Sequence, residues 1–188
     1  MHLNPVDYFE KHKTIFNMLD IDEIISAVDL INHTSLSGGT IFTCGNGGSA
    51  TTASHMITDW NKMVFTHTNR QFKGICLCDN VGLLTAYAND LSYEDVFVGQ
   101  LSSLYKEGDL LLTVSGSGNS PNTIKAANFA NENGMKTLSI VGFDGGLLKK
   151  ISQHCVHVPS FDMQICEDIH LMFNHLVMKD LCGLDIKN

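Results

Sequence analysis

The chain has 188 residues, of which 44% are hydrophobic and 17% charged, and its formal net charge is −8. This composition is typical of a globular domain and excludes a largely disordered chain. The acidic balance argues against nucleic acid or an anionic membrane as a partner, and an apolar run long enough to cross a bilayer is absent.

The first residues lack the basic-then-apolar order of a signal peptide. The six cysteines include no CxxC pair, and three of them lie in apolar, strand-like runs. We therefore expect reduced, buried thiols and a cytoplasmic protein.

Two helices are expected first, over residues 4–19 and 22–36, because apolar residues recur there three and four positions apart. Short apolar runs then predict buried strands at 40–44, 74–78, 110–115, 137–142 and 155–159. Helical patterns alternate with them at 49–64, 80–88, 93–106, 121–133 and 145–152, and a long helix closes the chain at 163–182. This alternation predicts a doubly wound, three-layer α/β/α sandwich around a five-stranded parallel sheet. We expect a single domain over 1–188, with a helical N-terminal extension over about 1–37.

Two turns rich in glycine and serine follow two of these strands: GNGGSA at 45–50 and SGSGNS at 115–120, with Pro121 next. Ligands of open α/β sheets bind beyond the carboxyl ends of the strands. Glycines admit an anion to the backbone amides, the next helix adds unpaired N–H groups, and serines add hydroxyl donors. Ordinary turns with Ser and Asn caps are the alternative, but two such turns together favour a phosphate site. Neither turn fits the dinucleotide fingerprint or the triphosphate P-loop.

A second group of residues lies on two of the predicted helices. His55 and Asp59 are four residues apart and share one helix face. Glu167, Asp168 and His175 lie on the closing helix, where residues seven or eight apart return to roughly one face. Such a set could bind zinc or act as acid and base, although a simple His–Asp hydrogen bond is the alternative. Spacing does not choose between Glu167 and Asp168.

The segments CGNGGSATTASH, VSGSGNSPN and EDIHLMFNH together resemble the sugar isomerase (SIS) domain, in its phosphoheptose isomerase branch. The resemblance implies an aldose–ketose isomerase that converts sedoheptulose 7-phosphate to D-glycero-D-manno-heptose 7-phosphate. It also implies one zinc per subunit and a homotetramer with sites at subunit interfaces, with no nucleic acid or membrane partner. The substrate contacts expected on this basis are Asn46, Gly47, Gly48, Ser49, Asp79, Ser115, Gly116, Ser117 and Ser120.

The same resemblance implies His55, Asp59, Glu167 and His175 as metal ligands, and Asp59, Glu167 and His175 as catalytic groups. Three positions depart from the family pattern. Asp59 stands where a glutamate is usual, Glu167 where a glutamine is usual, and Gln164 where an aspartate is frequent. The shorter Asp59 leaves open whether it or Glu167 is the base.

A non-enzymatic branch of the same fold binds the replication initiator protein, and CDNVGLLTAYANDLSYEDVF at 78–97 resembles that branch as much as the enzymes. A sugar-phosphate-sensing protein, which would need the phosphate site but no base or metal, is a third reading. His175 favours the isomerase, because the adaptor branch lacks the late histidine.

Overall fold

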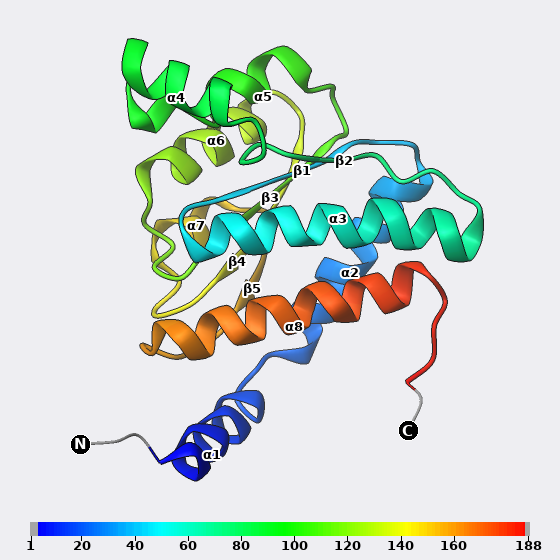
Figure 1. Cartoon of the computed structure of the whole chain (residues 1–188), viewed down its shortest axis with the longest axis vertical. Coiled ribbons are helices and arrows are strands. Elements are labelled where there is room, and N and C mark those ends of the chain that lie inside the picture. Colours follow the sequence, from blue (N-terminus) through cyan, green and yellow to red (C-terminus); the bar gives the residue numbers. More distant parts are fainter. Residues whose placement is uncertain (1–3, 187–188) are drawn as a thin grey trace.

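The computed structural model describes residues 4–186, so the first three and last two residues of the expected domain lie outside the described part. Its centre is a parallel sheet in the order β2-β1-β3-β4-β5 (Figure 1). The strands are β1 (Ile41–Gly45), β2 (Gly74–Cys76), β3 (Leu110–Ser115), β4 (Lys136–Val141) and β5 (His154–His157). The predicted α/β sandwich with five parallel strands is confirmed.

The strand order reverses direction next to β1. The chain passes from β1 outward to β2, then crosses back over β1 to β3 and continues to β4 and β5. The carboxyl ends of β1 and β3 are therefore neighbours, with Gly45 opposite Val114. Such a switch point leaves a crevice at the sheet edge, because the two following connections run to opposite faces. Both glycine/serine turns open onto this crevice.

Helices cover both faces of the sheet. On one face lie α2 (Ile21–Leu36), α3 (Gly48–Thr68) and α8 (Met163–Leu181), and α3 and α8 run side by side there (Figure 1). The other face carries α4 (Val81–Asp90), α5 (Val98–Leu104), α6 (Pro121–Glu132) and α7 (Gly146–Ile151). Helix α1 (Pro5–Phe16) packs beside the first half of α8. None of the helices in the described range combines the length and apolarity needed to cross a membrane.

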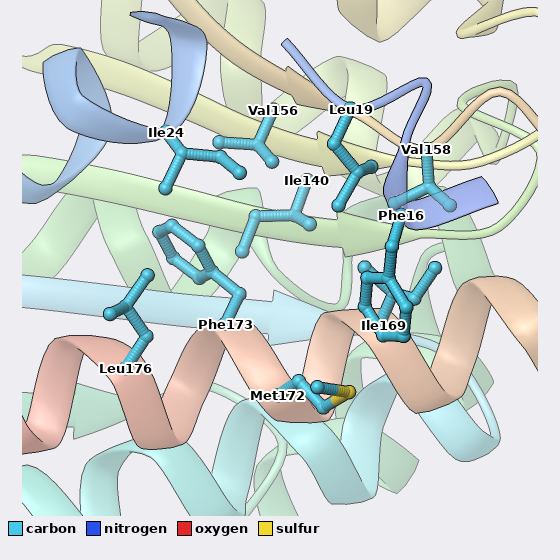
Figure 2. Close-up of a pocket in the computed structure, with 10 residues that line it drawn as sticks. All are labelled: Phe16, Leu19, Ile24, Ile140, Val156, Val158, Ile169, Met172, Phe173 and Leu176. Carbon is cyan, nitrogen blue, oxygen red and sulfur yellow. The ribbon is translucent and has the colours of Figure 1, made fainter. Parts of the chain in front are cut away.

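Alternating strand residues supply the two halves of the core. In β3, Leu110, Leu112 and Val114 face α3 and α8, whereas Leu111 faces the opposite layer. A cavity of about 250 Å³ remains between α8, the sheet and the segment joining α1 to α2 (Figure 2). Its lining is apolar throughout and consists of Phe16, Leu19, Ile24, Ile140, Val156, Val158, Ile169, Met172, Phe173 and Leu176. Because it offers no polar partner, this cavity does not suit an anion or a sugar.

The prediction of one continuous helix over residues 93–106 was wrong. Residues 93–106 form a short 3₁₀ turn at Tyr93–Asp95 followed by α5, with a break between them. The break falls at Val96 and Phe97, two consecutive side chains that are both fully buried. Helix α5 therefore begins only at Val98. Helix α3 also runs four residues further than expected, to Thr68.

Candidate active site

The two turns after β1 and β3 enclose a polar cavity of about 210 Å³ at the switch point. It is lined by Asn46, Ser49, Val114, Ser115, Gly116, Ser117, Ser120, Met163 and Glu167. The four serines named from the sequence therefore meet in one place, together with Asn46 and Gly116. No lysine or arginine of residues 4–186 lines this cavity, so an anion there would be bound by neutral donors and helix ends alone. We call this cavity the serine cradle.

The first turn is shaped by its glycines. A Cβ on Gly45 would lie 2.7 Å from the main-chain oxygen of Ser49 and 2.8 Å from that of Val114, so only glycine lets these backbones meet. Gly47 has a φ of 55° and caps α3 without a side-chain hydrogen bond. The backbone N–H groups at the start of α3 thus lack a capping side chain and carry the positive end of the helix dipole.

In the second turn, the serines hold the backbone and also face the cavity. Ser115 Oγ accepts from the N–H of Gly118 at 3.0 Å, and Ser117 Oγ accepts from the N–H of Asn119 at 3.2 Å. Ser120 is the N-cap residue of α6, yet its side chain makes no capping hydrogen bond. Its hydroxyl is therefore free to donate to a ligand.

An amide pair joins the first turn to α6. Asn46 Nδ2 donates to Asn122 Oδ1 and Asn122 Nδ2 donates back to Asn46 Oδ1, both at 2.9 Å. The hydroxyl of Tyr93 also donates to Asn46 Oδ1. These bonds fix the orientation of Asn46, whose second amide N–H remains for the cavity. Neither Asn122 nor Tyr93 was predicted from the sequence as a site residue.

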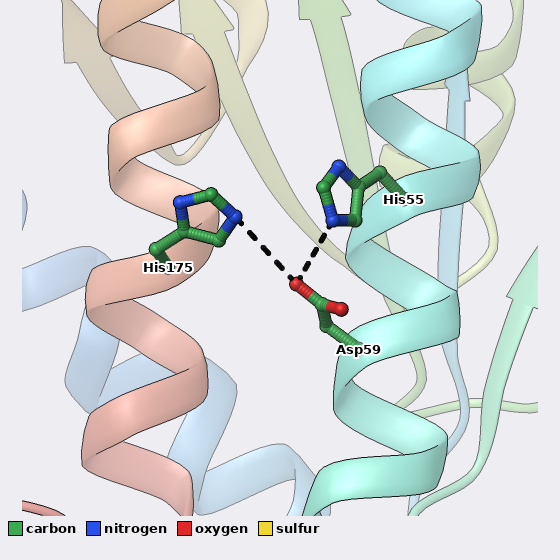
Figure 3. A group of neighbouring side chains, drawn as sticks. All are labelled: His55, Asp59 and His175. Atoms are coloured by element: carbon green, nitrogen blue, oxygen red, sulfur yellow. Dashed lines mark ion pairs between the residues drawn. The ribbon is translucent and has the colours of Figure 1, made fainter.

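Less than two turns along α3, a second group of side chains lies between α3 and α8 (Figure 3). Asp59 Oδ2 is 3.2 Å from His55 Nε2 and 3.8 Å from His175 Nε2, and the two imidazole rings are 5.3 Å apart. One ligand atom from each residue lies within 4.8 Å of the others, so the three could hold a metal ion. We call these three residues the histidine cluster. Its side chains are partly open to solvent.

A buried residue of α8 holds the Asp59 side chain in place. Asn174 is fully buried and donates from Nδ2 to Asp59 Oδ2 at 3.0 Å. The main-chain oxygen of Asn174 accepts from the indole N–H of Trp60 at 3.3 Å. The shorter aspartate therefore still has a defined direction, towards both histidines. A neutral asparagine within a helix carries no sequence signal of function, so Asn174 was not predicted.

Glu167 does not join the histidine cluster. It lines the serine cradle, and its carboxylate faces the first residue of α3, because a Cβ on Gly48 would lie 2.5 Å from Glu167 Oε1. Glu167 lies eight residues before His175, which corresponds to about 12 Å of helix rise and about 80° of rotation around α8. Asp79 is exposed after β2 and does not line the cradle either. Gly47 and Gly48 form the turn itself.

Asp168, the alternative to Glu167, takes part in a contact with α1. It accepts hydrogen bonds from the hydroxyl of Tyr8 and lies 3.0 Å from His12 Nε2. The Asp168 carboxylate raises the pKa of Tyr8 to about 12, chiefly through this hydrogen bond. All three residues line a cavity of about 440 Å³ that also reaches His175.

A fully buried histidine, His170, lies on α8 between Glu167 and Asn174 in the sequence. Neither of its ring nitrogens has a hydrogen-bond partner among the described residues. Burial lowers its pKa to about 4, because the charged imidazolium would lose its hydration. His170 is therefore neutral near pH 7.

Known proteins resemble the chain in both sequence and structure. Residues 7–142 match the SIS domain family. Phosphoheptose isomerase from Helicobacter pylori (strain P12) is 38% identical over 151 residues, covering 80% of this chain and 78% of that protein. The enzyme of the same name from Aliarcobacter butzleri (strain RM4018) is 33% identical over 173 residues, or 91% of each chain.

Solved structures lead to the same group. Phosphoheptose isomerase from Neisseria gonorrhoeae superposes with a TM-score of 0.87 at 25% identity, covering 95% of this chain and 97% of that one. The Francisella tularensis enzyme gives a TM-score of 0.86 at 26% identity, with 96% and 98% covered. The likeness thus spans nearly the whole chain. The chain belongs to the SIS domain family and, within it, to the phosphoheptose isomerases.

Proposed function

We propose that the chain is an isomerase that converts sedoheptulose 7-phosphate to D-glycero-D-manno-heptose 7-phosphate. The observation that carries this proposal is the histidine cluster between α3 and α8, because the first turn of α3 also forms one wall of the serine cradle. Six residues of helix, a rise of about 9 Å, separate Ser49 from His55. A seven-carbon sugar phosphate can bridge this span, with its phosphate in the cradle and its reacting carbons at the cluster.

The phosphate would be bound by Ser49, Ser115, Ser117 and Ser120 and by the start of α3, which has no side-chain cap. These groups are held by the strand ends and by the Asn46–Asn122 pair, so little reorganisation is needed when the ligand arrives. Binding at this distant end orients the reacting carbons and lowers the entropic part of the barrier. Asn46 would donate its remaining N–H to the sugar.

The reaction moves a proton between adjacent carbons through an enediol. Asp59 would remove the proton from C1, the freed electron pair would form the C1–C2 double bond, and the C2 carbonyl oxygen would gain a proton. The proton would then return to C2 while the C1 hydroxyl loses its own proton and becomes the carbonyl. His175, beside Asp59, would transfer the protons at the oxygens. The position of Asp59 between both histidines supports it, rather than Glu167, as the base.

Two imidazoles and one carboxylate fit a zinc site with an open coordination position. We propose His55, Asp59 and His175 as its ligands in each subunit. When bound, zinc would polarise the substrate carbonyl and stabilise negative charge on the adjacent oxygens. Asn174 would keep the Asp59 carboxylate turned towards the site.

The homotetramer with sites at subunit interfaces is also part of this proposal. Large apolar side chains are exposed on the helices around the site, which supports burial against other copies: Val6, Phe9, Ile21, Ile25, Met172 and Leu176. The half-exposed His55 and His175 leave room for a neighbouring subunit. The six unpaired cysteines support the cytoplasm as the compartment.

Turnover of sedoheptulose 7-phosphate by the purified chain, followed by the appearance of the aldose, tests the proposal directly. We expect activity together with about one zinc per chain by elemental analysis. Turnover that is lost on chelation and restored by zinc would link the metal to the reaction. No turnover of any C5–C7 ketose phosphate by zinc-loaded protein would refute the isomerase, and capture of the replication initiator would then favour the adaptor.

A further inference from the structure

Glu167 places a negative charge where the proposed function puts a phosphate. Its side chain lines the serine cradle together with the four serines. A Cβ on Gly48 would lie 2.5 Å from Oε1 and 2.8 Å from Oε2, so both carboxylate oxygens face the Cα of the first α3 residue. The absence of a side chain at Gly48 is what makes room for them.

The surroundings of the Glu167 carboxylate can stabilise one negative charge but offer little to a second. Gly47 caps α3 without a side-chain bond, and the first turn of α3 contains no acidic residue of its own. The N–H groups of Ser49 and Ala50 donate to main-chain oxygens of the turn, but no acidic side chain of α3 offsets its helix dipole. The Glu167 carboxylate therefore lies at a helix N-terminus, where negative charge is stabilised. It makes no ion pair with a described lysine, arginine or histidine, and no cationic side chain lines the cavity.

We propose that Glu167 is a specificity-determining residue whose carboxylate competes with phosphate for the start of α3. This inference rests on the proposed function, because it takes the serine cradle as the phosphate site. A bare phosphate must either displace this carboxylate or bind beside it, and like charges at short range in a partly buried cavity repel strongly. Binding of inorganic phosphate is consequently weak.

The same carboxylate favours a particular class of ligand. Ionised carboxylates accept hydrogen bonds but cannot donate them, so Glu167 attracts hydroxyl groups while repelling phosphate oxygens. A phosphate ester with a polyhydroxylated chain supplies those donors and recovers part of the electrostatic cost. The cradle thereby selects polyol and sugar phosphates over free phosphate, a distinction that the serines alone do not make.

The Glu167→Gln variant tests this role, because glutamine keeps the shape of the side chain and removes its charge. Calorimetric titration of the zinc-loaded full chain with inorganic phosphate and with sorbitol 6-phosphate, which has no carbonyl to react, gives both dissociation constants. In Glu167→Gln we expect inorganic phosphate to bind about tenfold more tightly and sorbitol 6-phosphate about twofold to threefold more tightly. The selectivity for the polyol phosphate falls accordingly.

Asp168→Asn is the matched control, since it removes the same charge one residue away from a side chain that lines a different cavity. It should leave both constants unchanged. Adding Ser120→Ala to Glu167→Gln should weaken phosphate binding, which locates the ion in the cradle. Unchanged or weaker phosphate binding in Glu167→Gln overturns the proposal, as does equal tightening in Asp168→Asn. Loss of zinc from Glu167→Gln without tighter phosphate binding overturns it in favour of a metal-ligand role.

These readouts do not depend on turnover. Tighter phosphate binding by Glu167→Gln in a chain without isomerase activity would support the role of Glu167 and refute only the proposed reaction. An active isomerase whose phosphate affinity does not respond to Glu167→Gln would refute the role of Glu167 alone.

Discussion

The serine cradle and the histidine cluster are built in different ways. The cradle is made by two contiguous turns at adjacent strand ends, where backbone amides and hydroxyls do the binding. The cluster consists of three side chains on α3 and α8, and its geometry depends on the packing of those helices and on the buried Asn174. Local sequence determines the first region, whereas tertiary packing determines the second. Substitutions should accordingly affect KM in the cradle and kcat in the cluster.

The largest effect is expected at His175. In His175→Ala, kcat for sedoheptulose 7-phosphate should fall by about a thousandfold while KM changes little, because an acid–base group and one of the three proposed zinc ligands are lost together. Steady-state kinetics at saturating substrate measures this. His67→Ala is the matched control, since His67 is exposed at the far end of α3. A His175→Ala variant that raised KM alone would place His175 in substrate binding instead.

His170, on the helix shared by both regions, should govern stability at low pH. Its pKa is about 4 in the folded chain against 6.5 ordinarily, so the unfolded chain binds a proton that the folded chain does not. The free energy of unfolding is therefore unaffected by His170 above pH 6.5. It decreases as pH falls from 6.5 towards 4, by about 3 kcal/mol. Denaturant unfolding from pH 7 to pH 4.5, followed by fluorescence of the single, buried tryptophan, Trp60, measures this.

The control for this pH dependence is His170→Leu, which removes the titrating group. Between pH 7 and pH 4.5 the variant should lose less free energy of unfolding than the unsubstituted chain. Equal losses in the two proteins would mean that His170 has a hydrogen-bond partner that keeps its pKa near normal.

A substitution at Asn174 tests how far the histidine cluster depends on the hydrogen bond from Asn174 to Asp59. In Asn174→Ala, kcat should fall about tenfold, since hydrogen bonds to charged groups contribute about 1.5–3 kcal/mol and Asp59 would lose its orientation. Asn131→Ala removes a partly buried, hydrogen-bonded asparagine on the other face of the sheet and should leave kcat unchanged. An equal fall of kcat in both variants would indicate general destabilisation, which thermal unfolding would reveal.

The fold was predictable because its signals are local. Continuous apolar runs marked the buried parallel strands, and glycine and serine marked the turns after β1 and β3. The cradle followed from the rule that adjacent strand ends share a crevice. His55 and Asp59 were paired by their spacing on one helix, and the structure brings His175 to them. Their roles as ligands and catalysts stay predictions.

What the sequence did not reveal depends on distances through space. The family resemblance grouped Glu167 with His175 as a metal ligand, but the eight residues between them rise about 12 Å along α8, and Glu167 lines the serine cradle instead. Asn122 and Asn174 are neutral amides whose importance comes only from the partners that folding brings to them.

The smallest effect is expected at Ser120, and it is also the cleanest test of the cradle. Its side chain makes no capping bond to α6, so Ser120→Ala should leave the free energy of unfolding unchanged, whereas loss of a true cap costs about 1 kcal/mol. Loss of one hydroxyl donor to the phosphate should raise KM about fivefold with kcat unaltered. Ser102→Ala, at an exposed site on α5, should change neither quantity. A Ser120→Ala variant that is less stable but has a normal KM would mean that Ser120 acts only as a helix cap. A raised KM at normal stability assigns the Ser120 hydroxyl to the ligand, and it shows that the cradle affects KM whereas the cluster affects kcat.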